Sequence, residues 1–342
     1  MSKIWKVAVI GTGDMGKQHI KGWQLAGHEV VSVTDIDLQR ARELATQFNV
    51  KQVYQDYKEA IVDRDVEIVS VCLPLALHAP VTIFAAEQGK HIFCEKPLAR
   101  NFREVADMEE AVRKAGVQFG LGLQRNLSVG VQTARQYVQE GRLGRPVIFH
   151  NDSLAQIRPK RVMHDADGNG GPLMDLGCHY YIMWQTVFAS RPKTVYARGQ
   201  LLAKDREELA HIAKLAYDTA QVTIEYETGD VGIFTVSWGL PPGVKLKAHV
   251  DRLYGPKGGL EGGFNNNAAK LTFYDGDQVS ELHLESYASL HNEQFRLFVD
   301  ALNEGKPAPV GFEAGKDVLA LTLAIFRSIE TGEVIDFGST IE

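Results

Sequence analysis

The chain has 342 residues, of which 44% are apolar and 23% are charged, and this composition excludes disordered and collagen-like chains. Its 37 basic and 43 acidic side chains give a formal charge of −6 with both signs dispersed along the sequence, which argues against nucleic-acid and anionic-membrane partners. No apolar run approaches the ~18–20 residues of a membrane span, and the apolar stretch after the first lysines is too short for a secretion signal.

The length is typical of two domains, at about 150 residues for each domain. The cysteines, Cys72, Cys94 and Cys178, are odd in number and have apolar neighbours. This pattern favours buried thiols in a reducing compartment over a disulfide framework. We therefore expect a cytoplasmic protein with two domains.

The first 123 residues alternate between β-rich and helical segments. Strands are predicted at residues 6–10, 29–34, 67–72, 91–94 and 118–123. Segments whose apolar residues recur at helical spacing lie between them, at residues 15–26, 38–48, 80–88 and 102–115. This alternation predicts right-handed βαβ units in an α/β domain with a doubly wound, mostly parallel sheet, and we assign residues 1–123 to it.

From residue 124 the pattern becomes that of an antiparallel sheet with helices. Strands are predicted just after Pro146 and at residues 194–202, 219–226, 231–240, 245–254 and 271–274. Helices are predicted at residues 129–140, 173–187, 293–303 and 314–331. Residues 203–214 interrupt the strands with a helical pattern to which we assign no role. We expect a second, α+β domain over residues 124–342.

A glycine-rich turn joins the first predicted strand to the first helix. It matches G-x-G-x-x-G with the residues Gly11-Thr12-Gly13-Asp14-Met15-Gly16. The first glycine allows the tight turn, Gly13 lets a pyrophosphate approach the backbone, and Gly16 lets helix and strand pack closely. The start of the helix then offers N–H groups to the phosphates. The turn therefore predicts a Rossmann-type dinucleotide site, with a purely structural turn as the alternative.

An acidic residue follows the second predicted strand. Asp35 can accept hydrogen bonds from the adenosine ribose hydroxyls, or it can simply cap a helix. Its charge repels the 2′-phosphate of NADP, and Ile36 and Asp37 supply no offsetting cation. Arg40, the nearest basic residue, is expected about a turn further along the helix. The sequence therefore favours NAD over NADP.

Two further segments follow predicted strands of the parallel sheet. Leu73-Pro74 and His78 come after strand 67–72, and Glu95-Lys96-Pro97 comes after strand 91–94. Ligands of open parallel sheets bind beyond the carboxyl ends of the strands. We therefore expect these residues to border the cofactor, with packing beneath it as the alternative role for His78.

With these segments, the sequence resembles the Gfo/Idh/MocA family, the relatives of glucose–fructose oxidoreductase and inositol dehydrogenase. The resemblance extends from the glycine turn and Glu95-Lys96-Pro97 to a Gly-Gly-x-x-x-Asp-x-Gly-x-His signature at residues 170–179 and to the late Ser328…Gly332 ending. It implies a C-terminal domain with a large, open, mainly antiparallel sheet, often used for oligomer contacts, and hence a homo-oligomer, a dimer or a tetramer. It also implies that Lys96, Asp175 and His179 match the catalytic lysine, aspartate and histidine of the family.

The chemistry of these three residues agrees with the resemblance. Asp175 and His179 are four residues apart, so on one helix they share a face. A carboxylate beside an imidazole fixes its tautomer and stabilises the imidazolium, so His179 can act as general base or acid and contribute about 10²–10⁴ in rate. The Lys96 ammonium can stabilise a developing alkoxide. The alternatives are a surface ion pair and a solvated loop cation.

The chain departs from the family pattern beside the histidine. Many members carry an aspartate three residues after it, where this chain has Ile182, and an asparagine where this chain has Leu75. Tyr180 and Tyr181 either face the substrate or are core aromatics. These departures weaken the transfer of the family's polyol-binding pattern more than that of the catalytic set.

Polar residues ahead of the signature indicate the substrate class. They are Asn151, Asp152, Arg158, Lys160, Arg161, His164 and Asp165, with Arg125 after the last strand of the first domain. They suit a polyhydroxylated ligand, or through the basic cluster a carboxylate or phosphate, and the alternative is a solvated loop. As substrate contacts we select Arg125 and His164 together with Lys96, Asp175 and His179.

The sequence thus predicts an NAD-dependent dehydrogenase that acts on a secondary hydroxyl of a sugar, cyclitol or sugar derivative. Two alternatives stay open within the same site, a keto-sugar reductase and a sugar–sugar oxidoreductase that retains its cofactor. A non-catalytic NAD(H)-responsive binding protein is a third. No C-x₂-C or H-E-x-x-H spacing occurs near the cysteines and histidines of the site, so we expect no metal.

Overall fold

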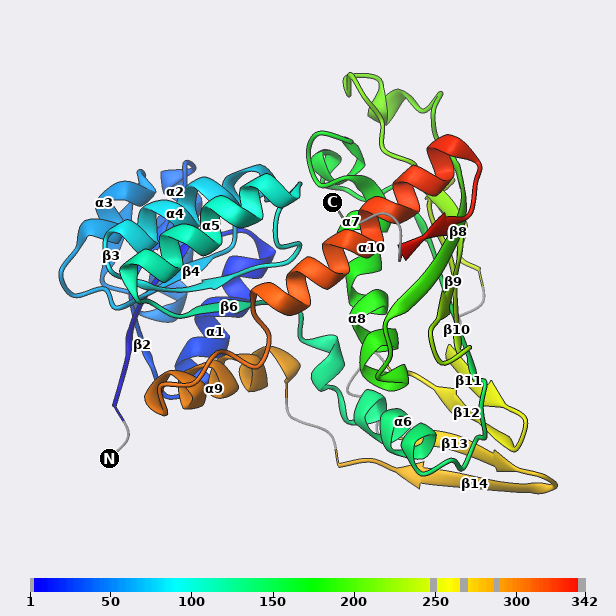
Figure 1. Ribbon diagram of the computed structural model, residues 1–342. Helices are drawn as coiled ribbons and strands as arrows, with labels where there is room; N and C mark the ends of the chain where they lie inside the picture. The colour runs from blue at the N-terminus through cyan, green and yellow to red at the C-terminus, as the bar shows by residue number, and fades with distance from the viewer. Residues whose placement is uncertain (1–2, 247–250, 265–269, 286–288, 338–342) are drawn as a thin grey trace. The chain divides into compact units, whose positions relative to one another are not determined.

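The computed structural model of the protein describes residues 3–246, 251–264, 270–285 and 289–337, which fall into two units (Figure 1). The first unit comprises the residues up to 123 together with 289–319, and the second comprises 124–288 together with 320–342. The expected second domain, residues 124–342, differs from this division, because 289–319 belong to the first unit.

The first unit contains a six-stranded parallel sheet in the order β3–β2–β1–β4–β5–β6. Its strands are β1 (Lys6–Ile10), β2 (Glu29–Thr34), β3 (Gln52–Tyr54), β4 (Ile68–Val71), β5 (His91–Cys94) and β6 (Phe119–Leu121). The helices between them are α1 (Asp14–Leu25), α2 (Leu38–Phe48), α3 (Tyr57–Val62), α4 (His78–Glu87) and α5 (Phe102–Ala115). This order confirms the predicted doubly wound sheet. Strand β3 and helix α3 were not predicted, because such short elements carry too little apolar periodicity.

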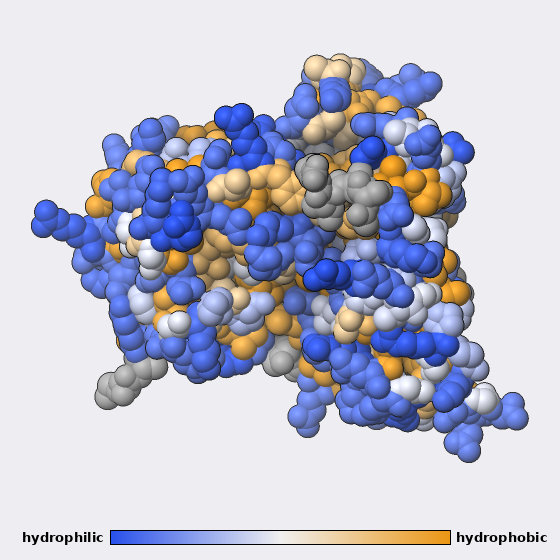
Figure 2. Space-filling model, in the orientation of Figure 1, coloured by the Kyte–Doolittle hydropathy of each residue, from blue (hydrophilic) through white to orange (hydrophobic). Residues whose placement is uncertain are grey.

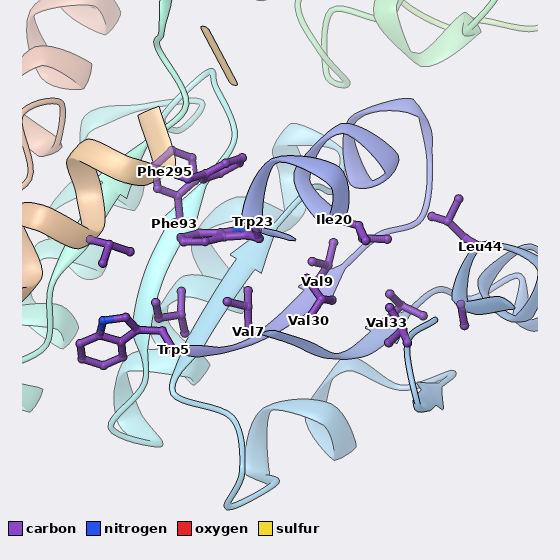
Figure 3. Packing of buried hydrophobic residues seen from close by; sticks show 14 of the residues in the cluster. Trp5, Val7, Val9, Ile20, Trp23, Val30, Val33, Leu44, Phe93 and Phe295 are labelled. Carbon is purple, nitrogen blue, oxygen red and sulfur yellow. The ribbon is translucent and has the colours of Figure 1, made fainter. Parts of the chain in front are cut away.

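An aromatic cluster explains why residues 289–319 belong to the first unit. Trp23 of α1 stacks on Phe295 of α9 (Leu290–Asn303) with the ring centroids 4.3 Å apart, and Phe93 of β5 meets Phe295 edge-on at 4.9 Å (Figure 3). Gly22 allows this approach, because a Cβ there would lie 2.4 Å from the Phe295 ring. All three aromatic side chains are buried, and burial of a phenylalanine contributes about 1.5–3 kcal/mol. The late helix α9 is therefore part of the first core.

The second unit contains a nine-stranded sheet in the order β14–β13–β12–β11–β7–β10–β9–β8–β15. Its strands are β7 (Ile148–Gln156), β8 (Pro192–Gln200), β9 (Thr219–Tyr226), β10 (Val231–Leu240), β11 (Asp251–Gly255), β12 (Gly258–Gly262), β13 (Lys270–Asp275), β14 (Gln278–His283) and β15 (Ile335–Asp336). Strands β7 and β10 pair in parallel, and the other pairs are antiparallel. The predicted large, mainly antiparallel sheet is confirmed. Of the predicted strand 245–254, residues 247–250 lie outside the described residues.

Helices pack on one face of the nine-stranded sheet. They include α6 (Val129–Gln139) and α8 (Gly177–Phe188), and Trp184 of α8 lies so close to Gly232 of β10 that a Cβ there would be 2.5 Å from the indole (Figure 1). Along β10, Phe234 is fully buried, whereas its neighbours Ile233 and Thr235 point to the other face and are partly exposed. Within the described residues, the sheet thus has one covered and one open face.

Two predicted helices differ from the structure. The predicted helix 173–187 is split into α7 (Gly171–Asp175) and α8, because the N–H of His179 donates to the carbonyl of Leu176 at 3.1 Å, while the thiol of Cys178 lies against the carbonyl of Asp175 at 3.4 Å. Residues 203–214 contain a single short 3₁₀-helix, Glu207–Leu209. There the carboxylate of Asp218 accepts hydrogen bonds from two successive backbone N–H groups at the start of the segment.

Helix α10 (Phe312–Thr331) contributes its residues up to 319 to the first unit and the rest to the second. No helix in the described part of the chain is both long and apolar enough to span a membrane. The surface visible in Figure 2 is mostly hydrophilic, and its apolar residues lie in scattered patches.

Candidate active site

The glycine turn follows β1 and leads into α1, at the carboxyl edge of the parallel sheet. Gly11 has a φ of +98°, and a Cβ at Gly16 would lie 1.9 Å from the carbonyl oxygen of Gly11, so both positions require glycine. A Cβ at Gly13 would meet nothing within 4 Å, and α1 begins there without a side-chain cap. The three glycines therefore have the roles that a pyrophosphate site requires. Gly11 and Gly16 form the turn, and Gly13 leaves open space beside the N–H groups of the first helical turn.

Asp35 follows β2 and is buried, with an exposed fraction of 7%. Its Oδ2 accepts hydrogen bonds from the N–H and the hydroxyl of Thr12, both at 2.8 Å, so the carboxylate is tied to the glycine turn. Its Oδ1 accepts the N–H of Asp37 at 3.0 Å. Burial acts to raise the pKa of Asp35, but these hydrogen bonds and one from Arg40 outweigh it and hold the pKa below its ordinary value.

Arg40 lies closer to Asp35 than predicted. Its Nη2 is 2.6 Å from Oδ1 of Asp35, so a cation does offset the charge of this carboxylate. The cause is the start of α2, where Asp37 is the N-cap residue and accepts the N–H of Arg40 at 3.1 Å. This cap holds Arg40 in the first turn of the helix, beside the end of β2. An N-cap aspartate followed three residues later by arginine is the signal that could have located it.

Glu95, which follows β5, is directed into the core. Its Oε1 lies 2.7 Å from Nε2 of His19, and Nδ1 of the same ring lies 2.8 Å from the hydroxyl of Ser70, which also accepts the indole N–H of Trp23 at 2.9 Å. The Oε2 of Glu95 accepts the N–H of Lys96 at 3.2 Å. The carboxylate of Glu95 thus holds the backbone of the Lys96 segment to helix α1.

His78 connects the two segments that follow β4 and β5. Its Nδ1 lies 2.8 Å from the carbonyl oxygen of Pro97 and its Nε2 lies 2.9 Å from that of Leu73. The ring is buried, and burial lowers the pKa of His78. Lys96 between these contacts is half-buried, and Pro74 is exposed. The imidazole thus connects the segment after β4 with the segment after β5.

In the second unit, Asp175 ends α7 and His179 lies in the first turn of α8. Both are buried, with exposed fractions of 8% and 6%, and Oδ1 of Asp175 accepts the amide of Asn169 at 3.2 Å. Asp175 and His179 belong to successive helices, and Leu176 between them keeps a right-handed helical backbone. Tyr181 is a core residue, since its ring packs against Gly177, where a Cβ would lie 2.4 Å from its oxygen.

The two remaining predicted substrate residues have different surroundings. Arg125, in the 3₁₀-helix Arg125–Leu127, lies with its guanidinium carbon 5.5 Å from the ring centre of Tyr180. Burial raises the pKa of Tyr180, and the charge of Arg125 acts against this rise. His164 is buried, and its Nε2 accepts the N–H of Arg158 at 2.9 Å, so this nitrogen is already engaged.

The cysteines and histidines form no metal site in the described residues, where no group of three or more His, Cys, Asp or Glu side chains could hold an ion. All three cysteines lie in that part of the chain and none forms a disulfide. Burial raises the pKa of the Cys94 and Cys72 thiols, which therefore stay protonated.

The predicted site residues divide between the units. The glycine turn, Asp35, Leu73, His78 and Lys96 gather at one edge of the parallel sheet, whereas Asp175, His179, Arg125 and His164 belong to the second unit. Sequence reasoning missed His19, the buried partner of Glu95, because nothing local marks a contact that spans 76 residues.

Comparisons with known proteins agree with this architecture. Residues 5–123 match GFO_IDH_MocA, described as an oxidoreductase family with an NAD-binding Rossmann fold, and residues 131–261 match the GFO/IDH/MocA C-terminal domain. The chain is 28% identical over 333 residues to myo-inositol 2-dehydrogenase of Thermotoga maritima, covering 95% of this chain and 96% of the relative. It is 24% identical over 336 residues to 1,5-anhydro-D-fructose reductase of Ensifer adhaerens, covering 96% and 97%. A solved structure of levoglucosan dehydrogenase in complex with NADH has the same fold, with a TM-score of 0.85 at 22% identity over 98% of this chain and 99% of that one.

Proposed function

Because the chain belongs to the Gfo/Idh/MocA family of oxidoreductases, whose N-terminal domain binds NAD, we propose that it transfers a hydride between NAD and a secondary hydroxyl of a sugar, cyclitol or sugar derivative. The observation that carries the proposal is the glycine turn, where Gly13 leaves open space at the start of α1 while Asp35 is fixed beside it. These residues fit the pyrophosphate and adenosine ribose of a dinucleotide. The names of the full-length relatives, an inositol dehydrogenase and an anhydrofructose reductase, support the substrate class.

We assign the proton chemistry to Lys96, Asp175 and His179. NAD, when bound, would supply the acceptor for the hydride of the substrate carbon. The proton of the same hydroxyl passes to the imidazole of His179, and the carboxylate of Asp175 stabilises the resulting imidazolium. The ammonium of Lys96 donates a hydrogen bond to the oxygen as negative charge develops on it. The low exposure of Asp175 and His179 supports this role, because charge interactions strengthen where water is excluded.

Measurement of NADH formation tests the proposal, with a panel that includes myo-inositol, scyllo-inositol, levoglucosan and 1,5-anhydrosugars as substrates. We expect Lys96→Ala and His179→Ala each to lower kcat by about 10²–10⁴ on the substrate that is turned over, the usual contribution of a positioned acid–base group. His211→Ala, which removes an exposed histidine of the same unit as His179, is the matched control and is expected to keep the wild-type kcat. Unchanged turnover in Lys96→Ala and His179→Ala would contradict the assignment of these residues, and a protein that turns over no substrate of the panel would favour a binding protein.

A reductase that works in the opposite direction is the second candidate, because one full-length relative is named as a reductase. The same three residues would then return a proton to the oxygen of a keto-sugar as the hydride reaches its carbon. A cofactor that is retained between two sugar substrates is a variant of this candidate. Absorbance of the nicotinamide after extensive dialysis of the purified protein distinguishes retention from release.

Two properties of the whole protein complete the proposal. We assign the open face of the nine-stranded sheet to contacts between copies of the chain, since partly exposed apolar residues such as Ile233 lie on it, and light scattering in solution measures the resulting mass. The lack of disulfides among three cysteines supports a cytoplasmic location. Arg125 and His164 keep their roles as proposed substrate contacts, and the Nε2 of His164 accepts the N–H of Arg158.

A further inference from the structure

A chain of buried polar groups leads from helix α1 to the Lys96 segment. The hydroxyl of Ser70 accepts the indole N–H of Trp23 at 2.9 Å and lies 2.8 Å from Nδ1 of His19. Nε2 of the same ring lies 2.7 Å from Oε1 of Glu95, whose Oε2 accepts the N–H of Lys96 at 3.2 Å. The first three of these side chains are fully buried, and Glu95 has an exposed fraction of 4%. Each polar group therefore depends on its neighbours in the chain, because bulk water does not reach it.

The groups at the two ends fix the direction of the hydrogen bonds between them. An indole N–H only donates, and an ionised carboxylate only accepts. Burial acts to raise the pKa of Glu95, but the hydrogen bond from His19 and the charges around it hold the pKa below its ordinary value, so Glu95 is ionised at neutral pH. Nε2 of His19 therefore carries the ring proton. Among the described residues, Nδ1 of His19 is the one acceptor that the hydroxyl of Ser70 reaches, so Nδ1 accepts.

The carboxylate of Glu95 restricts the backbone beside Lys96. A Cβ at Gly122 would lie 2.9 Å from Oε1 of Glu95, so the loop after β6 encloses the carboxylate opposite His19. Because Lys96 follows Glu95 directly, the bond from its N–H to Oε2 fixes the peptide between them. On the other side of Lys96, the carbonyl oxygen of Pro97 lies 2.8 Å from Nδ1 of His78. The backbone from which the Lys96 side chain starts is thus held at both ends.

We propose that His19 is a positioning residue for Lys96 and acts through Glu95. The imidazole orients the carboxylate, and the carboxylate orients the backbone that carries the ammonium. A displacement of about 1 Å at a reacting group lowers the rate by about 10²-fold. Loss of this chain should therefore lower kcat and leave the affinity for the dinucleotide unchanged. The inference rests on the proposed function, in which Lys96 stabilises the developing negative charge.

Two substitutions of Glu95 with similar length separate its hydrogen bonds from its packing. Glu95→Met fills the space but offers only a weakly accepting sulfur, and we expect it to lower kcat by about 10–100-fold. Glu95→Gln keeps an oxygen for the N–H of Lys96, and its amide N–H can donate to Nε2 of His19 once the ring proton moves to Nδ1. We expect Glu95→Gln to keep kcat within about threefold of wild type.

His19→Leu breaks the same chain from the other side and should lower kcat as Glu95→Met does. The double variant should be no slower than the slower single variant, because both substitutions remove one interaction. The Kd for NADH, measured by fluorescence titration, should stay within about threefold of wild type in all of them. Val30→Ala, which truncates a buried residue of the same core, is the matched control and should lower stability while keeping kcat.

Two readouts of the chain do not depend on turnover. In ¹⁵N NMR of the histidine-labelled full chain, the signal that His19→Leu lacks belongs to His19, and we expect its proton on Nε2 in wild type and on Nδ1 in Glu95→Gln. Hydrogen exchange of the peptide that contains Lys96 should accelerate in Glu95→Met and His19→Leu and stay slow in Glu95→Gln.

Several results would overturn the inference. They are equal losses of kcat in Glu95→Met and Glu95→Gln, a wild-type ring proton on Nδ1, additive losses in the double variant, and a loss of kcat in Val30→Ala as large as that in Glu95→Met. If wild type turns over no sugar, the proposed reaction fails, and hydrogen exchange decides the inference. Faster exchange in Glu95→Met but not in Glu95→Gln then supports the positioning of Lys96, and equal exchange in both overturns it.

Discussion

Asp35 and Glu95 follow two strands of the same parallel sheet, β2 and β5, yet they have partners of opposite kinds. Burial acts to raise the pKa of each carboxyl group, and hydrogen bonds hold each pKa below its ordinary value. Asp35 has a half-exposed arginine as its charged partner, whereas Glu95 is paired with His19, whose side chain is fully buried. The charged partner of Asp35 can thus be exchanged for a ligand, whereas the partner of Glu95 is enclosed in the core.

The comparison shows that one edge of the sheet carries two different pairs. We call Asp35–Arg40 the replaceable pair and Glu95–His19 the fixed pair. Exposed ion pairs contribute about 0–1 kcal/mol, whereas breaking a buried pair costs about 3–5 kcal/mol because a buried charge is left uncompensated. The fixed pair carries the Lys96 segment, since Oε2 of Glu95 accepts the N–H of Lys96. The Asp35–Arg40 pair lies at the proposed dinucleotide site, where a bound ribose would replace Arg40 as the partner of Asp35.

The largest expected effect comes from breaking the fixed pair. His19→Ala should lower the free energy of unfolding by about 3–5 kcal/mol, because Glu95 and the hydroxyl of Ser70 lose their buried partner. Urea denaturation followed by circular dichroism measures this loss. Part of it arises from the cavity, so a double-mutant cycle with His19→Gln and Glu95→Gln isolates the coupling. A coupling energy near zero would show that the pair is not what stabilises this region.

The fixed pair also predicts a pH dependence of stability. The pKa of Glu95 in the folded protein lies below 4.5 because His19, with smaller contributions from Lys96 and His291, outweighs burial. A carboxyl group with a depressed pKa stabilises the fold above its ordinary pKa and loses that contribution as the pH falls through the folded value. The stability difference between wild type and Glu95→Gln should therefore shrink as the pH falls from about 4.5 through the lower pKa of the folded protein, by about 1.4 kcal/mol for each unit of depression.

Chemical denaturation at a series of pH values measures this difference. Acid protonates many carboxylates at once, and the difference between the two proteins cancels the loss of stability that they share. Asp35→Asn is a second case, whose stability difference from wild type should also shrink at low pH, because the pKa of Asp35 is depressed as well. A difference that stays constant over the whole range would contradict the assignment of Glu95 as a buried anion.

The sequence predicted those features whose cause is local. The glycine turn and the position of Asp35 follow from the residues of one βαβ unit, and both sheets follow from periodicity. The pairing of Glu95 with His19 and the return of α9 to the first core are tertiary contacts that no local pattern marks. The break of the predicted helix at Leu176 has both a local and a tertiary side. The local sequence favours one continuous helix, but hydrogen bonds to the carbonyl groups of Leu176 and Asp175 interrupt it.

The smallest expected effect comes from breaking the replaceable pair. Arg40→Ala should change the free energy of unfolding by less than about 1 kcal/mol, since three donors remain on Asp35 and the lost partner is half-exposed. The change should decrease further in about 1 M salt, which shortens the range of charge interactions to about 3 Å. Urea denaturation at low and high salt measures both values beside those of His19→Ala. A loss as large as that of His19→Ala would mean that Arg40 is a structural partner of Asp35, and it would contradict the description of this pair as exchangeable.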